Sequence, residues 1–341
     1  MLNTSNMTAL KVGGVWIDPN VLIGLINGAP HLEQLEFSIC PCNAAESDCS
    51  AQHFTANQQL PRIIGQIDNL TILKIASVCL WRCDIDHLGL GSRLIEMVRQ
   101  LGRRGRLTEL SVDRNLFTSG LIRAIADHMH RLRCLEYGSV SDNDLKYALR
   151  RLPHLEELKV GIWPCKFDVF SFISDHLPQL KSLSVEEPLK INLSSLIQLV
   201  QLPNLKHLRL HSEFYLTGDS DWANLPKLNL ETLEFPKLVE WSNNSVGGFI
   251  KKCPNLRLLS LPENATDGDL NEIGRSCRYL EELRIGHCNQ VTASGIQAVI
   301  DGCAKLKVVK VSDSMDLNHG AQLKMAKYRK INFEYTLPWK F

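Results

Sequence analysis

One short phrase recurs along the chain and constrains its fold more than any other feature. The phrase consists of an apolar residue, two variable residues, a second apolar residue, one variable residue and a third apolar residue, as in LEELKV from Leu155. Most successive copies lie about 25 residues apart, so the chain is predicted to be a stack of similar units rather than one globular core. The copies begin at Met7, Leu32, Leu70, Leu107, Leu132, Leu155, Leu180, Leu205, Leu230, Leu256, Leu280, Leu306 and Tyr328.

Segments with helical spacing lie between the phrases. After Ser119, Ser141 and Asp267, apolar residues recur at steps of three and four, which is typical of a helix with one buried face. Ser141 and Thr292 stand where an N-cap side chain would bind free backbone N–H groups. Each unit is therefore predicted to be a strand, a turn and a helix. A phrase of this kind at this period predicts an α/β leucine-rich-repeat solenoid, a horseshoe with a parallel sheet on its concave side and helices outside.

The spacing also predicts the domain organisation. Two intervals between phrases are longer than the rest, which indicates insertions at 38–60 and 76–100. Otherwise the period continues from one end of the chain to the other. We expect a single solenoid over residues 1–341 with about 12 repeats.

Composition and charge exclude several classes of partner. The 341 residues are 44% hydrophobic and 22% charged, and the formal net charge is +1. Nucleic acids and anionic membranes attract concentrated positive charge, so neither is expected as a partner. The N-terminus has no basic start followed by a long apolar run, and no stretch of about 18 apolar residues occurs. The 11 cysteines are therefore expected to be free thiols in the cytoplasm, with the nucleus as the alternative location.

The cysteines of the last units indicate a family. The unit LEELRIGHCNQVTASGIQAVIDGCAKL, which starts at Leu280, resembles the cysteine-containing repeat of F-box/leucine-rich-repeat proteins. Cys288 follows its strand and Cys303 ends its helix, while Cys253 and Cys277 take the same helix-end position in the preceding units. Free cysteine packs as a small hydrophobe, so we expect all four to fill the junction between helix and strand.

The resemblance implies a role in recognising proteins. In that family the repeats select a substrate, and a separate F-box docks them onto a cullin-based ubiquitin ligase. Here the repeats begin near Met7, so we expect no F-box ahead of them. The segment from Leu60 to Trp81 resembles the start and end of an F-box, but it is short and the phrase from Leu70 occupies its middle. A cullin-ligase adaptor is therefore expected as a partner only if an F-box exists.

Three functions are compatible with the sequence. The leading one is a protein-binding scaffold that resembles the substrate-recognition subunit of an SCF-type ubiquitin ligase. The first alternative is a ubiquitin-independent adaptor, inhibitor or assembly factor, and the second is an enzyme regulator. The histidines are scattered, without a motif that links one to a nucleophile and an orienting acid, so the chain is not expected to be an enzyme.

The variable positions of the phrase predict the binding surface. Side chains alternate along a strand, so these positions form two ladders on the concave face. Their charges are mixed in sign, which favours a protein partner over a polyanion. The first ladder is Gln34, Ile72, Glu109, Cys134, Glu157, Ser182, His207, Thr232, Leu258, Glu282 and Val308. The second is Glu36, Lys74, Ser111, Glu136, Lys159, Ser184, Arg209, Glu234, Ser260, Arg284 and Lys310.

Arginine and aromatic residues, the usual anchors of protein interfaces, are richest in the middle of these ladders and in the loops beside them. We expect a protein partner on the concave face and the adjoining loops. An ordinary polar face without a ligand is the alternative. The predicted contact residues are Glu157, Lys159, Trp163, His207, Arg209, His211, Phe214, Tyr215, Glu234 and Arg284.

Two further clusters have ordinary interpretations. Cys40, Cys42, Cys49, His53, Cys79 and Cys83 lie in or near the insertions, but the spacing C-x-C-x6-C matches no recognised zinc finger. We expect free thiols there, no metal and no other cofactor. The basic run Arg99, Arg103, Arg104 and Arg106 is interpreted as a solvated helix end, where the helix dipole favours cations. Binding of nucleic acid or anionic lipid is the alternative for this run.

Overall fold

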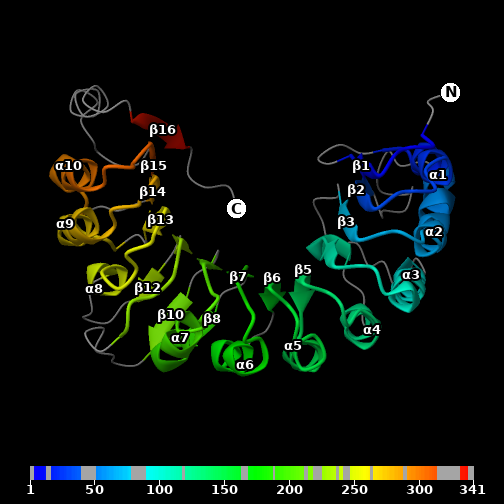
Figure 1. Ribbon diagram of the computed structural model, residues 1–341, viewed down its shortest axis with the longest axis horizontal. Helices are drawn as coiled ribbons and strands as arrows, with labels where there is room; N and C mark the ends of the chain where they lie inside the picture. The colour runs from blue at the N-terminus through cyan, green and yellow to red at the C-terminus, as the bar shows by residue number, and fades with distance from the viewer. Residues whose placement is uncertain are drawn as a thin grey trace. The chain divides into compact units, whose positions relative to one another are not determined.

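The computed structural model of the chain divides into two compact units, Met1–Lys166 and Phe167–Phe341. Within each unit, parallel strands line one side and helices the other, so the leucine-rich-repeat solenoid is confirmed (Figure 1). That one solenoid domain spans the whole chain stays a prediction. The structure describes residues 4–12, 17–39, 51–77, 90–116, 120–162, 168–186, 189–210, 214–217, 225–235, 238–240, 246–261, 264–286, 290–312 and 331–336.

In the first unit the strands pair in sequence order, each parallel to the next. The strands are β1 (Ala9–Lys11), β2 (Gln34–Ile39), β3 (Ile72–Ser77), β4 (Glu109–Val112), β5 (Cys134–Val140) and β6 (Glu157–Ile162). The helices are α1 (Pro19–Asn27), α2 (Ala51–Gly65), α3 (Leu90–Arg104), the short 3-10 helix η1 (Arg114–Leu116), α4 (Leu121–His128) and α5 (Asp142–Leu149).

The second unit contains two parallel sheets. The main sheet has the order β7 (Ser182–Val185), β9 (His207–Leu210), β11 (Thr232–Glu234), β13 (Leu258–Leu261), β14 (Glu282–Ile285), β15 (Val308–Ser312) and β16 (Asn332–Thr336). A small sheet, which the phrase does not predict, joins β8 (Leu189–Asn192), β10 (Phe214–Thr217) and β12 (Leu238–Glu240). The helices are α6 (Val169–His176), α7 (Leu193–Val200), α8 (Val246–Ile250), α9 (Asp267–Ser276) and α10 (Ala293–Gly302).

The leading leucines of the phrases form the core between strands and helices. From Leu32 to Leu306 their exposed fractions lie between 0% and 7%. The N–H of many of these leucines donates to the carbonyl three residues earlier, as in Leu132 to Met129 (3.1 Å) and Leu280 to Cys277 (3.2 Å). This bond closes the turn between helix and strand, which is why the residue three before the leucine is held at the core.

The strand register agrees with the predicted phase, except at the last copy. On β16, Asn332 pairs with Val308 and Phe333 pairs with Val309. The last strand is therefore two residues later in the chain than a phrase that begins at Tyr328 predicts. Phe333, which is half-buried, continues the column of Leu283 and Val309.

The predicted caps are confirmed. The Ser141 hydroxyl accepts the N–H of Asp144 (3.3 Å), and the Thr292 hydroxyl accepts the N–H of Ser294 (3.2 Å). At α9, Thr266 and Asp269 form a reciprocal capping box. At each of these helix starts, a side chain therefore accepts a hydrogen bond from a backbone N–H group that the helix itself leaves free.

The segments predicted as insertions each include part of a helix that takes its place in the stack. Helix α2 lies beside α3, and α3 lies beside α4. The phrase from Leu70 forms β3, so this part of the F-box-like segment is a repeat strand. Among the described residues, no helix has both the length and the apolarity needed to cross a bilayer.

Candidate functional site

Each unit has a strand face, the side of its main sheet that carries the variable positions of the phrase. Strand register joins these positions into the two predicted ladders. The apolar residues of the same strands alternate with them and point into the core, as the burial pattern of β4 and β14 shows. The ladder residues therefore lie on the side of the sheet that faces away from the core.

A continuous chain of ion pairs runs along the strand face of the second unit. The Nε of Arg209 lies 2.7 Å from Glu234, whose other oxygen lies 2.6 Å from Arg284. The Nε of Arg284 also lies 2.7 Å from Glu282. Lys310 continues the chain from Glu282 (3.2 Å) to Glu334 (3.3 Å). Three cations and three carboxylates alternate, so this face is locally neutral.

One link in this chain spans two strand spacings. Glu234 on β11 and Arg284 on β14 are separated by β13, which places Ser260 between them. Ser260 is 7% exposed, and its short side chain lets the guanidinium reach over it. The resulting pair is well shielded, because the side chains of Glu234 and Arg284 are 11% and 22% exposed.

The strand face of the first unit has a shorter polar network. Lys74 pairs with Glu109 (2.5 Å), and Glu136 accepts from the Ser111 hydroxyl (2.7 Å) and pairs with Lys159 (2.6 Å). Burial raises the pKa of Glu136, but hydrogen bonds from Lys159 and Ser111 outweigh it, so the pKa lies below its usual value. The hydrogen bond to Glu109 raises the pKa of Lys74. Both groups are held in their charged forms.

Cys134 also lies on this face, between Glu109 and Glu157 in the register. Burial and the neighbouring carboxylates raise the pKa of its thiol to about 11. A nucleophilic cysteine needs the thiolate, which cations or a helix N-terminus stabilise. Cys134 is therefore a poor nucleophile, and it is one of the small side chains of the ladder.

The structure places six of the ten predicted contact residues on the strand faces. On β6 of the first unit, Glu157 is exposed and Lys159 is half-buried. The strand face of the second unit carries His207, Arg209, Glu234 and Arg284. The His207 ring lies 3.0 Å from the Thr232 hydroxyl. Phe214 and Tyr215 belong to β10 of the small sheet rather than to the ladders. Trp163 and His211 lie outside the described residues, and binding by any of the ten stays a prediction.

A third ladder at the start of the strands was missed by the sequence analysis. It consists of the second residue of each phrase. The carboxylate of Glu231 pairs with Lys206 (2.8 Å), and that of Glu281 pairs with both Arg257 (3.0 Å) and Lys307. The signal was present, because the sign of charge alternates over five successive copies: Lys206, Glu231, Arg257, Glu281 and Lys307.

The helix-end cysteines are structural, as predicted. Cys253, Cys277 and Cys303 are at most 1% exposed, and the Cys253 thiol lies 3.7 Å from the carbonyl of Phe249. Burial raises the pKa of Cys277 to about 12 and that of Cys253 well above its ordinary value. Cys288 and the cysteines considered for zinc lie outside the described residues, as does the side chain of His53. Within the described part of the chain, no group of three metal-ligating side chains converges.

Comparisons with known proteins support the fold and give a weak link to one class of protein. No family model matches the chain. F-box protein SKIP1 of Arabidopsis thaliana is 28% identical over 71 residues, which cover 20% of this chain and only 24% of that protein. A chain in the crystal structure of the Rad7 and Elc1 complex in yeast matches with a TM-score of 0.54 and 16% identity. That match covers 91% of this chain and 70% of the other, so the two share a fold.

Proposed function

We propose that this chain is a protein-binding leucine-rich-repeat scaffold that serves as the substrate-recognition part of a cullin-based ubiquitin ligase. The observation that carries the binding function is the ordered strand face, where charged side chains of successive repeats hold one another in place. The likeness to an F-box protein and to a chain of the Rad7 and Elc1 complex supports the ligase context.

The ion-pair chain suits a protein partner. Long side chains that are already held lose less conformational freedom on binding, so more of the contact energy appears as affinity. Alternating signs also favour a partner with a complementary alternation and disfavour a uniformly charged polymer. On the second unit we propose His207, Arg209, Glu234 and Arg284 as contacts, with Phe214, Tyr215 and His211 beside them.

On the first unit, Glu157 and Lys159 are the proposed contacts, together with Trp163. Glu157 is exposed and Lys159 pairs with Glu136.

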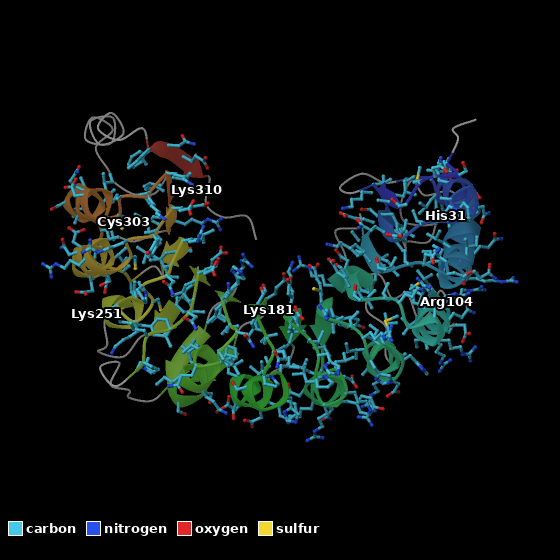
Figure 2. The ribbon with its side chains drawn as sticks, in the orientation of Figure 1. His31, Arg104, Lys181, Lys251, Cys303 and Lys310 are labelled. Carbon is cyan, nitrogen blue, oxygen red and sulfur yellow. The ribbon has the colours of Figure 1, made fainter. Side chains whose placement is uncertain are left out.

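The binding function is tested with the tagged full-length protein in cells. Arg209→Ala combined with Tyr215→Ala should reduce recovery of the partner, while Glu234 keeps its second pair with Arg284 and the fold persists. The control is Lys251→Ala on the helix side of the second unit (Figure 2). Unchanged recovery of the partner by the double variant, with an intact circular-dichroism spectrum, would contradict the proposed surface.

The ligase context is tested separately. The wild-type complex should contain a cullin and its adaptor, and the level of the captured partner should rise when the protein is depleted. A ubiquitin-independent adaptor is the second candidate, because the phrase from Leu70 forms repeat strand β3 within the F-box-like segment. A stable partner complex that lacks a cullin would favour that candidate and overturn the first.

A further inference from the structure

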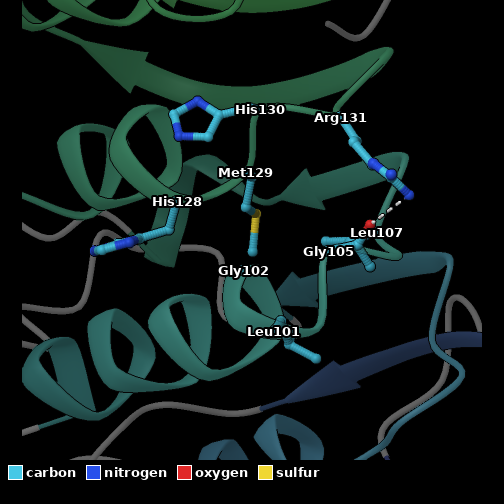
Figure 3. Close-up of a pocket in the computed structure, with 8 residues that line it drawn as sticks. All are labelled: Leu101, Gly102, Gly105, Leu107, His128, Met129, His130 and Arg131. Carbon is cyan, nitrogen blue, oxygen red and sulfur yellow. Dashed lines mark hydrogen bonds between the residues drawn. The ribbon is translucent and has the colours of Figure 1, made fainter.

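A pocket of about 190 Å³ lies at the C-terminal ends of α3 and α4, where the chain leads from each helix toward β4 and β5. Figure 3 shows the residues that line it, with the Met129 side chain lying between the two helix ends. Leu101, Leu107 and Met129 are 2–3% exposed and form an apolar floor. The rest of the lining is Gly102, Gly105, His128, His130 and Arg131.

At this junction the α3 repeat lacks the apolar side chain that most repeats place there. Three residues before the leading leucine, most repeats place an apolar residue, buried at Leu152, Leu177 and Cys277, although the repeat led by Leu230 has the exposed Lys227 there. The α3 repeat has Arg104 there. Its guanidinium turns to Asp68 (2.8 Å) and the carbonyl of Gln66 (3.3 Å), so it leaves the junction.

Two glycines shape this junction. A side chain at Gly102 would meet the backbone carbonyl of His128 at 2.6 Å, so α3 and α4 approach closely only because this position is glycine. Gly105 has a φ of 62° and faces open space, with no atom closer than 3.8 Å to an added Cβ. Its carbonyl accepts a hydrogen bond from Arg131 across the mouth of the pocket (3.4 Å, Figure 3).

One cation, Arg131, lines the pocket, and two more, Arg103 and Arg106, are sequence neighbours of lining residues Gly102, Gly105 and Leu107. Arg103, Arg106 and Arg131 are exposed, and none of them pairs with a carboxylate in the described part of the chain. His128 and His130 are exposed beside them. The neighbouring acids have other partners: Asp68 pairs with Arg104, Glu156 with Arg133, and Asp127 with Arg151.

We infer that this pocket is a second docking site, for an acidic peptide segment of a protein partner that inserts one aliphatic side chain. An apolar cavity of roughly 150 Å³ accommodates a benzene-sized group, so this pocket has room for a leucine or methionine side chain. The anchor side chain would be desolvated in the pocket, and desolvated anchors of this kind dominate binding. The arginines would attract carboxylates on either side of the anchor. Such binding would give the basic run a role in addition to the favourable interaction of its cations with the helix dipole.

The test uses the full-length protein and a fluorescently labelled peptide with one leucine flanked by glutamates. Anisotropy should show saturable binding, and replacement of the leucine by alanine should weaken it about tenfold or more. Arg103→Glu, Arg106→Glu and Arg131→Glu together should weaken it at least as much. The matched control is Arg275→Glu, Arg278→Glu and Lys305→Glu, which reverses exposed cations at helix ends of the second unit.

A measurement on the unmodified protein guards against variants that fail to fold. A photoreactive leucine analogue at the anchor position should cross-link within 101–107 or 128–131. Equal affinity of the leucine and alanine peptides would overturn the pocket as the anchor site. The proposal is likewise overturned if both triple variants lose binding equally, if cross-links map elsewhere, or if anionic vesicles or RNA bind at this site in preference to the peptide.

Discussion

Glu234 is the residue on which the ion-pair chain of the second unit depends. The change Glu234→Gln keeps the size of the side chain but removes the charge that Arg209 and Arg284 share. Exposed ion pairs contribute up to about 1 kcal/mol, whereas breaking a buried one costs about 3–5 kcal/mol. Glu234 is 11% exposed and its partners 35% and 22%, so we expect a loss of about 2 kcal/mol in the free energy of unfolding.

The assay is urea-induced unfolding of the full-length protein at low and high salt. The loss should persist at high salt, because a shielded pair is screened less than an exposed one. The matched control is Glu281→Gln in the third ladder. Glu281 also bridges two cations, Arg257 and Lys307, but these are 59% and 70% exposed, so no measurable loss is expected. Equal losses in the two variants would refute the argument that shielding sets the strength of these pairs.

Three further predictions concern pH and packing. Because burial raises the pKa of Cys277 from 9.0 to about 12, the unfolded chain ionises first, and the free energy of unfolding should fall as the pH rises from 9 toward 12. Cys277→Ala should flatten that slope in urea titrations. The pKa of Glu282 is raised by burial but lowered more by its bonds to Arg284 and Lys310, so its contribution should disappear as the pH falls below 4.5, and Glu282→Gln should reduce this acid sensitivity. Gly102→Ala should lower the free energy of unfolding by about 1–3 kcal/mol through its clash with α4, whereas Gly24→Ala, which meets nothing within 4 Å, should be neutral or stabilising.

The repeat, and the positions that it dictates, can be read from the amino-acid sequence alone. The phrase located the main-sheet strands from Ala9 to Ser312, the buried leucines and the two ladders, because side-chain alternation and the 25-residue period are local properties of the chain. It also placed Cys253, Cys277 and Cys303 at the helix ends. The alternating charges of the third ladder were readable in the same way.

The partners of the long charged side chains depend on how the repeats stack. Arg284 reaches Glu234 across β13 because Ser260, 24 residues before it in the chain, has a short side chain. Arg104 turns to Asp68 of the preceding repeat and leaves a pocket beside Gly105. Flexible side chains choose partners from neighbouring repeats, so their positions depend on stacking rather than on the phrase. The repeat therefore predicts the course of the backbone in its strands and helices. The stacking of the repeats determines which charged side chains pair with one another and which stay unpaired.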